Sequence, residues 1–157
     1  MDNMPQDSQV KMSEAEAQEL MRSLLHKEGS WVEWGKGCQR LQKAGYDSQR
    51  IFEDTGFQNS QQNLVIVAAQ VFDNLVQAGV NESVLDYFRG PRSDVLYEFR
   101  ILNQQQRVDA SLLAHDKQVN IDGAVIISKA VKDVSRMSQL PGQIRHPISW
   151  MISKGDR

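Results

Sequence analysis

The sequence predicts an all-α fold of about seven helices, and three observations carry that prediction. First, apolar residues recur at helical spacing, and no segment shows the clear period-two alternation of a half-buried strand. Second, helix-capping patterns precede most of the periodic segments. Third, glycines or a proline–glycine pair stand where these segments end. We expect a helix-turn-helix-like module over residues 13–79 and a second helical module over residues 80–140. We also expect a disordered lead-in over residues 1–12 and a tail, or the start of a linker, over residues 141–157.

Four helices are predicted in the first module. Ser13 and Ser30 each precede a glutamate by three residues, which is the capping-box pattern in which side chain and backbone satisfy each other's hydrogen bonds. Ser48 and Asn59 open the other two helices. The last helix is apolar on nearly all sides, so we expect it to be central and buried. The predicted ranges are 14–27, 31–44, 49–55 and 59–77.

Three further helices are predicted in the second module. Asn81 begins a short helix that ends near Arg89. The chain breaks at Gly90-Pro91, and Pro91 suits a first helical position because its missing N–H has no partner to lose there. We expect one long helix from this point through the polar stretch 103–107 and toward Lys117. Asp122 then starts a last helix that ends near Ser138.

Composition restricts the function. The formal charge of −2 gives no global positive field toward nucleic acid or anionic lipid. The longest apolar run, 64–69, is too short to span a bilayer, so we expect no membrane partner. Cys38 is the only cysteine, which excludes an internal disulfide and a cysteine-built zinc site; we interpret it as a small buried filler. The three histidines are scattered, so we expect no enzyme, no metal and no cofactor.

A helix-turn-helix invites a second interpretation. Residues 51–67 fit that motif, with Ile51 and Phe52 inward and Gly56 at the turn. In DNA-binding versions the second helix enters the major groove, where Asn59, Gln61 and Gln62 could contact adenine edges. However, this helix carries no lysine or arginine, and residues 48–79 sum to −2, so it cannot neutralise phosphates. We therefore expect no nucleic-acid partner and keep a nucleic-acid-binding regulator as an alternative.

Two stretches have an unusual residue pattern. They are residues 30–46 (SWVEWGKGCQRLQKAGY) and residues 87–107 (YFRGPRSDVLYEFRILNQQQR). Together they resemble the helical part of the Rubisco accumulation factors of cyanobacteria and plant chloroplasts. The likeness runs in order from about Leu20 to Arg136, and its most specific part is the string GPRSD within a segment rich in tyrosine, phenylalanine and arginine.

The resemblance implies a function that composition and spacing do not show. In that family a helix-turn-helix-like module and a second helical module precede a linker and a β-rich domain that dimerises. The resemblance implies an assembly chaperone of the cyanobacterial cytoplasm or chloroplast stroma. Its dimer embraces antiparallel dimers of the Rubisco large subunit and carries them to the eight-subunit core, where small subunits displace it. The β-rich domain is absent here, so we expect this chain to be a monomer and the full-length protein a homodimer.

The candidate partner-binding surface is a positively charged segment in an otherwise mildly acidic chain. Residues 89–107 carry a net charge of +2. Arginine and tyrosine are over-represented as anchors of protein interfaces. The plainer interpretation is that Arg92 or Arg89 holds the Gly90-Pro91 turn and pairs with Asp94 or Glu98 on the same helix. We expect Tyr87, Phe88 and Phe99 to be core residues rather than partner contacts. The candidate residues are Arg89, Arg92, Asp94, Tyr97, Glu98, Arg100 and Arg107.

Three smaller interpretations accompany this one. Trp31 and Trp34 share a helical face, and we expect them to pack against a neighbouring helix rather than form a docking patch. Gly35 and Gly37 lie inside a helix, at a cost of about 1 kcal/mol each, so something must pack closely there. Finally, the chain could be a passive spacer arm whose partner contacts are all made by the absent domain.

Overall fold

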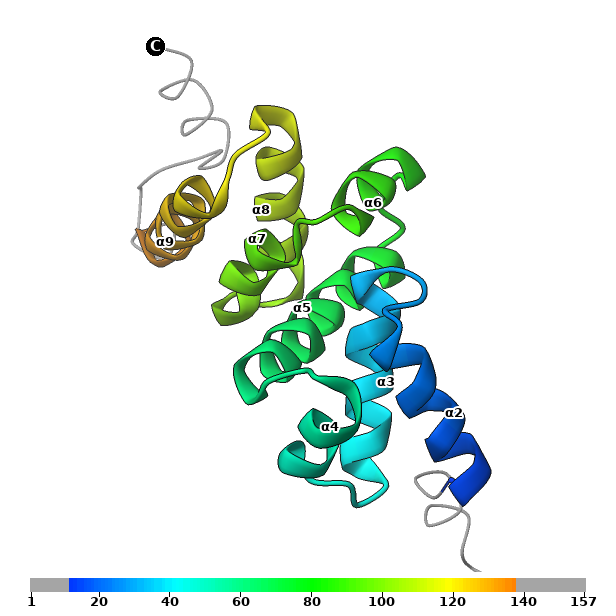
Figure 1. Cartoon of the computed structure of the whole chain (residues 1–157). Coiled ribbons are helices and arrows are strands. Elements are labelled where there is room, and N and C mark those ends of the chain that lie inside the picture. Colours follow the sequence, from blue (N-terminus) through cyan, green and yellow to red (C-terminus); the bar gives the residue numbers. More distant parts are fainter. Residues whose placement is uncertain (1–11, 138–157) are drawn as a thin grey trace, which may run out of the picture. The chain divides into compact units, whose positions relative to one another are not determined.

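A computed structural model describes residues 12–137, and in that range the all-α prediction is confirmed, because every regular element is helical (Figure 1). The expectations for residues 1–11 and 138–157 lie outside the described residues. The elements are α2 (Glu14–Leu25), α3 (Trp31–Lys43), α4 (Ser48–Thr55), α5 (Asn59–Gln77), α6 (Glu82–Arg89), α7 (Ser93–Tyr97), the 3₁₀ helix η1 (Glu98–Ile101), α8 (Gln104–Lys117) and α9 (Ile121–Met137).

Contacts within the chain divide it into two compact units. Unit 1 ends at Ala69 and unit 2 begins at Gln70, so the division falls inside α5. Unit 1 therefore contains α2, α3, α4 and the first part of α5, and unit 2 contains the rest of α5 and the helices that follow. The domain boundaries proposed from the sequence stay predictions.

The predicted caps organise unit 1. Ser13 with Glu16, and Ser30 with Glu33, both form complete capping boxes. The start of α4 differs from expectation, because Asp47 and not Ser48 is its N-cap and accepts a hydrogen bond from the Arg50 N–H. Gly56 ends α4 in the left-handed conformation that a glycine adopts without strain.

The close approach predicted at the α3 glycines is found at Gly35. A β-carbon at that position would overlap the carbonyl of Val65 and lie 2.8 Å from the β-carbon of Ala69, both on α5. Gly37 faces the flexible end of Leu20 instead. The helix-turn-helix thus has α5 packed directly on the backbone of α3, and Cys38 beside them is fully buried as expected.

A buried glutamine holds the helix-turn-helix together. Gln62 is completely buried, and its amide donates to the backbone carbonyls of Ser48 and Phe57 while its oxygen accepts from Gln42. Ile51 is buried as predicted, but Phe52 is not: it is 39% exposed, so the expectation that both point inward is wrong for Phe52. The two residues are neighbours on a short helix, which turns the second toward solvent.

The single long helix expected after Pro91 is wrong. Arg92 is the N-cap of α7, a helix of only five residues, and η1 continues it to Ile101. Leu102 is then extended, and Asn103 starts α8 through a capping box with Gln106. The break lets α7, η1 and α8 each turn apolar side chains inward.

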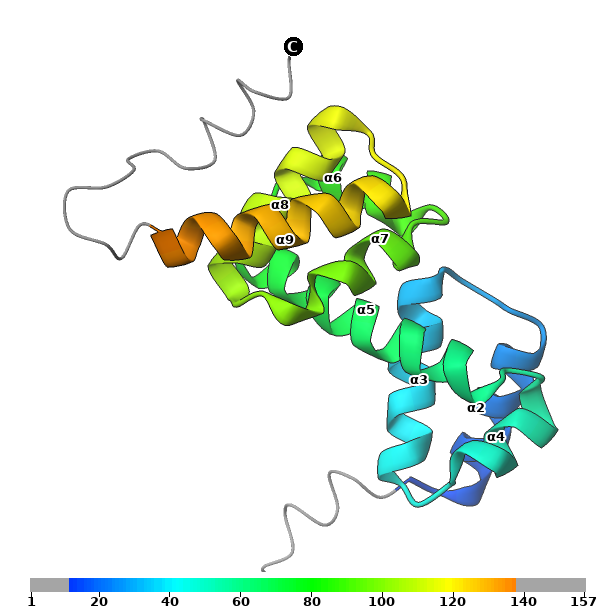
Figure 2. The same ribbon diagram turned by 90° about the vertical axis from the view of Figure 1, so that its left-hand side faces the viewer.

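The core of unit 2 forms where α9 lies against these elements. Helix α9 contacts α8, η1 and α7; it lies on the left of the unit in Figure 1 and crosses the front of the unit in Figure 2. Phe88 and Phe99 are completely buried, in agreement with their predicted core role, whereas Tyr87 is only half-buried. The ammonium of Lys132 on α9 donates to the carbonyl of Ile101 at 2.7 Å and fixes the end of η1.

Candidate protein-binding surface

An arginine–tyrosine pair marks the turn between α6 and α7. The guanidinium of Arg92 lies 4.0 Å from the centre of the Tyr87 ring, and one of its N–H groups donates to the Tyr87 carbonyl at 3.0 Å. The arginine reaches across Gly90, where a β-carbon would lie 2.6 Å from its terminal nitrogen. Arg92 therefore holds the Gly90-Pro91 turn, as the plainer interpretation of the sequence proposed, and Tyr87 is its partner.

A second pair repeats this geometry nearby on the chain. The guanidinium of Arg100 lies 4.0 Å from the centre of the Tyr97 ring and donates to the Tyr97 carbonyl at 3.0 Å. The carboxylate of Glu98 is 3.9 Å away. Each arginine is thus fixed by the ring and the backbone of one tyrosine, and its further N–H groups can still reach a partner. We call these two the Arg–Tyr pairs, Arg92–Tyr87 and Arg100–Tyr97.

Arg89 and Asp94 have local roles. Arg89 bridges Glu82 and Asp86 on its own helix at 2.7 and 2.9 Å and lies over the ring of Phe72. Hydrogen bonding to Glu82 is the main reason that its pKa is raised. Asp94 lies in the first turn of α7 and accepts a hydrogen bond from the Val95 N–H. These two residues stabilise helix ends and offer less to a partner than the Arg–Tyr pairs do.

Arg107 is tied into the fold of unit 2. Its guanidinium donates to the carbonyls of Phe99 and Arg100 at 3.2 and 2.7 Å and to the side chain of Asn74 at 2.7 Å. Partial burial lowers its pKa from the ordinary value. The structure therefore groups the seven candidate residues by role: Arg92, Tyr97, Glu98 and Arg100 around the Arg–Tyr pairs, Arg89 and Asp94 at helix ends, and Arg107 at the junction of η1, α8 and α5.

The sequence interpretation missed Tyr87. We assigned it to the core with Phe88, whereas it is half-buried and makes edge contacts with Phe88 and His115 while Arg92 covers its face. The spacing of five residues between this tyrosine and Arg92, across a glycine, was the available signal. It is a weak one, because it becomes a contact only through the conformation of the turn.

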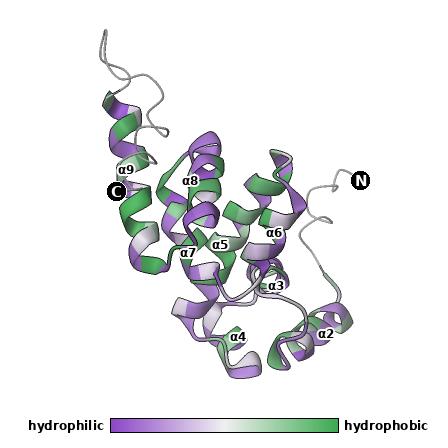
Figure 3. Ribbon diagram, turned by 90° about the horizontal axis from the view of Figure 1, so that it is seen from above, coloured by the Kyte–Doolittle hydropathy of each residue, from purple (hydrophilic) through white to green (hydrophobic). Residues whose placement is uncertain are grey.

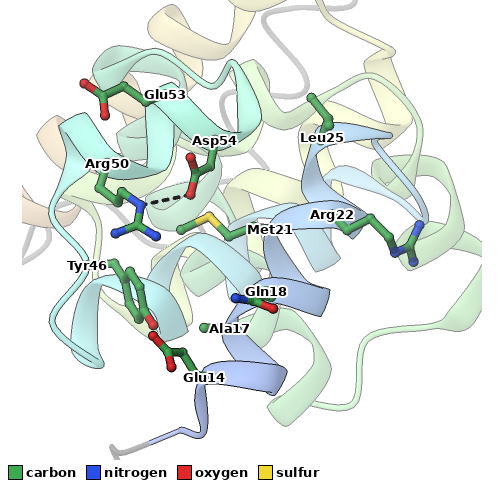
Figure 4. Close-up of a pocket in the computed structure, with 10 residues that line it drawn as sticks. All are labelled: Glu14, Ala17, Gln18, Met21, Arg22, Leu25, Tyr46, Arg50, Glu53 and Asp54. Atoms are coloured by element: carbon green, nitrogen blue, oxygen red, sulfur yellow. Dashed lines mark hydrogen bonds and ion pairs between the residues drawn. The ribbon is translucent and has the colours of Figure 1, made fainter.

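Unit 1 carries a separate recess between α2 and α4, shown in Figure 4. Its volume is about 400 Å³, and the buried side chains of Ala17 and Met21 line it. At its rim Arg50 pairs with Asp54 at 2.9 Å and lies over the ring of Tyr46. The carboxylates of Glu14 and Glu53 also line the recess, and the residues that line it include no assembled catalytic groups.

The helix-turn-helix surface is poorly suited to reading DNA. Gln62, one of three residues considered for base contacts, is fully buried, and Gln61 accepts the backbone N–H of Gln58 as a helix cap. Trp31 is buried, and Trp34 packs edge-on against Phe57 in the turn between α4 and α5 while its indole N–H donates to the Glu28 carbonyl. The motif's polar side chains therefore serve its own packing.

Within residues 12–137, no group of three or more histidine, cysteine, aspartate or glutamate side chains is placed to hold a metal ion. Burial raises the pKa of the Cys38 thiol to about 11, which keeps it protonated and unreactive. None of the helices in this part of the chain is long and apolar enough to cross a membrane.

Comparison with known protein families shows the family to which this chain belongs. The model described as the Rubisco accumulation factor 1 helix turn helix domain matches residues 16–76, and the one described as the Rubisco accumulation factor 1 alpha helical domain matches residues 88–150. The chain belongs to the Rubisco accumulation factor 1 family. The two matches together span most of its length. The first contains residues 30–46 and the second contains residues 88–107, the two stretches on which the resemblance was based.

Individual relatives agree with the family match. The chain is 57% identical to RuBisCO accumulation factor 1 of Synechocystis over 142 residues, which are 90% of this chain and 40% of the relative. It is 50% identical to that of Picosynechococcus, over 94% of this chain and 41% of the relative. Rubisco accumulation factor 1.1, chloroplastic, of Arabidopsis thaliana is 36% identical over 67% of this chain and 24% of its own length. The chain thus spans about two fifths of its cyanobacterial relatives.

Proposed function

We propose that this chain is the part of a Rubisco assembly chaperone that binds Rubisco large subunits and promotes or stabilises their assembly into dimers and octamers. It acts by surface complementarity, without catalysis or a cofactor, in the cytoplasm of a cyanobacterium or the stroma of a chloroplast. Membership of the Rubisco accumulation factor 1 family supports the choice of partner. The chain alone is a monomer, and the full-length protein dimerises through a domain outside this chain.

The proposed binding surface rests on one observation, the two matching Arg–Tyr contacts Arg92–Tyr87 and Arg100–Tyr97. Both arginines are stacked at 4.0 Å and fastened to a carbonyl at 3.0 Å. A side chain already held in one conformation loses little further entropy on binding, so more of its interaction energy appears as affinity. Guanidinium groups bind carboxylates through two parallel hydrogen bonds, so acidic side chains of the large subunit are the expected contacts.

Charge reversal tests this surface. The double variant Arg92→Glu, Arg100→Glu is expected to lose at least about tenfold in affinity for large-subunit core, since truncating a binding hot spot alone costs about 2 kcal/mol or more. The matched control is Arg50→Glu, which removes an arginine that also lies over a tyrosine but in unit 1. Circular dichroism must show that both variants fold. Unchanged binding by a folded double variant would falsify the proposed surface.

Two measurements on the wild-type chain separate the two alternatives. A passive spacer arm predicts that no variant matters, because the wild-type chain itself shows no binding to the core even at high concentration. A nucleic-acid-binding regulator predicts salt-sensitive retardation of DNA or RNA in a gel. Retardation by the wild-type chain together with absent core binding would favour that alternative.

A further inference from the structure

The recess of unit 1 between α2 and α4 has no part in the proposed large-subunit surface. Its volume of about 400 Å³ lies within the range of about 300–1,000 Å³ that is typical of ligand pockets. The buried side chains of Ala17 and Met21 line it, and so does Leu25, which is 53% exposed. Figure 4 shows these three side chains in succession along α2, and Figure 3 shows hydrophobic residues beside hydrophilic ones on the same helix. The recess therefore has an apolar strip that a large aliphatic side chain can cover.

The two arginines that line the recess are already paired. Arg22 binds Glu19 at 2.6 Å and Glu28 at 2.9 Å, and Figure 4 shows its guanidinium directed away from the other lining side chains. Arg50 binds Asp54 across the rim at 2.9 Å. The positive charges of the recess are thus neutralised within unit 1 and attract an acidic partner only weakly.

Two carboxylates that line the recess are left without such a partner. Glu14 in the first turn of α2 and Glu53 on α4 are both exposed, and neither forms a salt bridge with a residue in the described range 12–137. Arg50 attracts Glu53 at longer range, but its hydrogen bond goes to Asp54. Helix α2 carries three glutamates and one arginine, a net charge of −2, and α4 carries two acidic residues and one arginine, a net charge of −1. Because both walls are negative, the recess favours a basic occupant.

We propose that this recess binds a short basic segment of a protein partner, in which one large aliphatic side chain stands between lysine or arginine residues. The aliphatic side chain covers Met21 and Leu25, and the flanking cations pair with Glu14 and Glu53. A methionine suits such a site because its unbranched thioether adapts its shape to the occupant. The Arg–Tyr pairs belong to unit 2 and favour acidic contacts, so the inference does not rest on the proposed large-subunit surface.

A titration with synthetic peptides tests the proposal on the isotope-labelled 157-residue chain. The probe is the pentapeptide Lys-Lys-Leu-Lys-Lys with blocked ends, which is expected to shift the amide NMR signals of α2 and α4 in a saturable way. A matched peptide with serine in place of leucine is expected to bind at least about tenfold more weakly, because it buries no aliphatic side chain. A second matched peptide with glycine in place of every lysine is expected to bind about threefold more weakly or worse, because exposed ion pairs contribute less.

Two double variants locate the binding site of the probe. Glu14→Gln with Glu53→Gln removes the two unpaired carboxylates and is expected to weaken binding by about threefold or more. The matched control, Asp116→Asn with Asp122→Asn, removes the same charge from exposed residues of unit 2 and is expected to leave the affinity unchanged. Circular dichroism establishes that both variants fold.

Four results would overturn the proposal. The first is the absence of saturable shifts in α2 and α4 of the folded chain. The second is equal affinity for the leucine probe and either matched peptide, which would mean that charge alone or apolar contact alone accounts for binding. The third is unchanged affinity in the folded glutamate variant. The fourth is a shift of the same signals when the free chain is concentrated, because a second copy would then be the occupant. No Rubisco is present in these titrations, so their failure leaves the proposed function standing.

Discussion

Gly35 is the position where α3 comes closest to α5, and we predict that Gly35→Ala destabilises unit 1. A β-carbon at residue 35 overlaps the carbonyl oxygen of Val65 and lies 2.7 Å from its carbonyl carbon and 2.8 Å from the β-carbon of Ala69. Backbone atoms and a β-carbon cannot rotate away as the end of a long side chain can. The two helices must therefore separate, and the packing around Cys38 and Leu41 must loosen.

The magnitude follows from two opposing effects. Alanine is favoured over glycine in a helix interior by about 1 kcal/mol. Overpacking a close-packed core costs about 1–3 kcal/mol, and the rigid neighbours of Gly35 place it at the upper end of that range. We expect a net loss of about 2 kcal/mol in the free energy of unfolding, measured by urea denaturation with circular dichroism.

Gly37→Ala is the matched control, because Gly37 lies two residues away in the same helix. Its nearest neighbour is the terminal carbon of Leu20 at 3.1 Å, which can move aside. The control is therefore expected to be neutral or slightly stabilising. If Gly35→Ala proved as stable as Gly37→Ala, the direct backbone contact between α3 and α5 would be wrong.

Three further predictions concern other buried contacts. Gln62→Leu leaves the carbonyls of Ser48 and Phe57 without their donor, so the urea midpoint should fall by the equivalent of about 2–4 kcal/mol, and an unchanged midpoint would refute the role of this glutamine. Arg107→Lys keeps the charge but loses the guanidinium group that donates to two carbonyls and to the side-chain amide of Asn74. We expect the free energy of unfolding to fall by about 1–2 kcal/mol, and an unchanged value would show that these contacts do not stabilise the fold. The Cys38 thiol should react with a thiol reagent at pH 8 only as fast as the chain unfolds. Because burial raises the pKa of this thiol from the ordinary 9.0 to about 11, the stability of the chain should fall as the pH rises from 9 toward 11, and Cys38→Ala should remove this pH dependence. Rapid labelling of Cys38 in the folded chain would contradict its burial.

Most of the fold could be predicted because the helix signals are local. The capping boxes at Ser13 and Ser30 start α2 and α3 where the sequence indicated, and left-handed glycines such as Gly56 and Gly79 follow the ends of α4 and α5. Such signals involve residues three or four apart, so they need no knowledge of tertiary structure. A local ambiguity explains the small error at Asp47, since it and Ser48 are both good N-cap residues.

The missed break between η1 and α8 had a local signal that was misinterpreted. Asn103 and Gln106 form a capping box, but the glutamine-rich stretch reads equally well as the exposed side of a continuous helix. The break is favoured by packing, because it lets Phe99 and Leu102 both become buried. Propensity alone does not contain that information.

The candidate surface was predictable in part. Its charge and its arginine and tyrosine content are sequence properties, but the roles of single residues depend on contacts that are distant in sequence. Arg107 binds Asn74, 33 residues away, and so supports the fold rather than projecting from it. Tyr87 becomes the platform for Arg92 only because Gly90 lets the chain turn back on itself.

The most direct test of the proposed function is an NMR titration of the isotope-labelled chain with Rubisco large-subunit octamer core. The method detects weak binding, which we expect because a single copy of the proposed surface gains no avidity. The account predicts saturable signal loss concentrated in residues 89–107 and strongest around Arg92, Tyr97 and Arg100. An unchanged spectrum in a large excess of core would contradict it, and the chain would then be a spacer for a binding domain elsewhere.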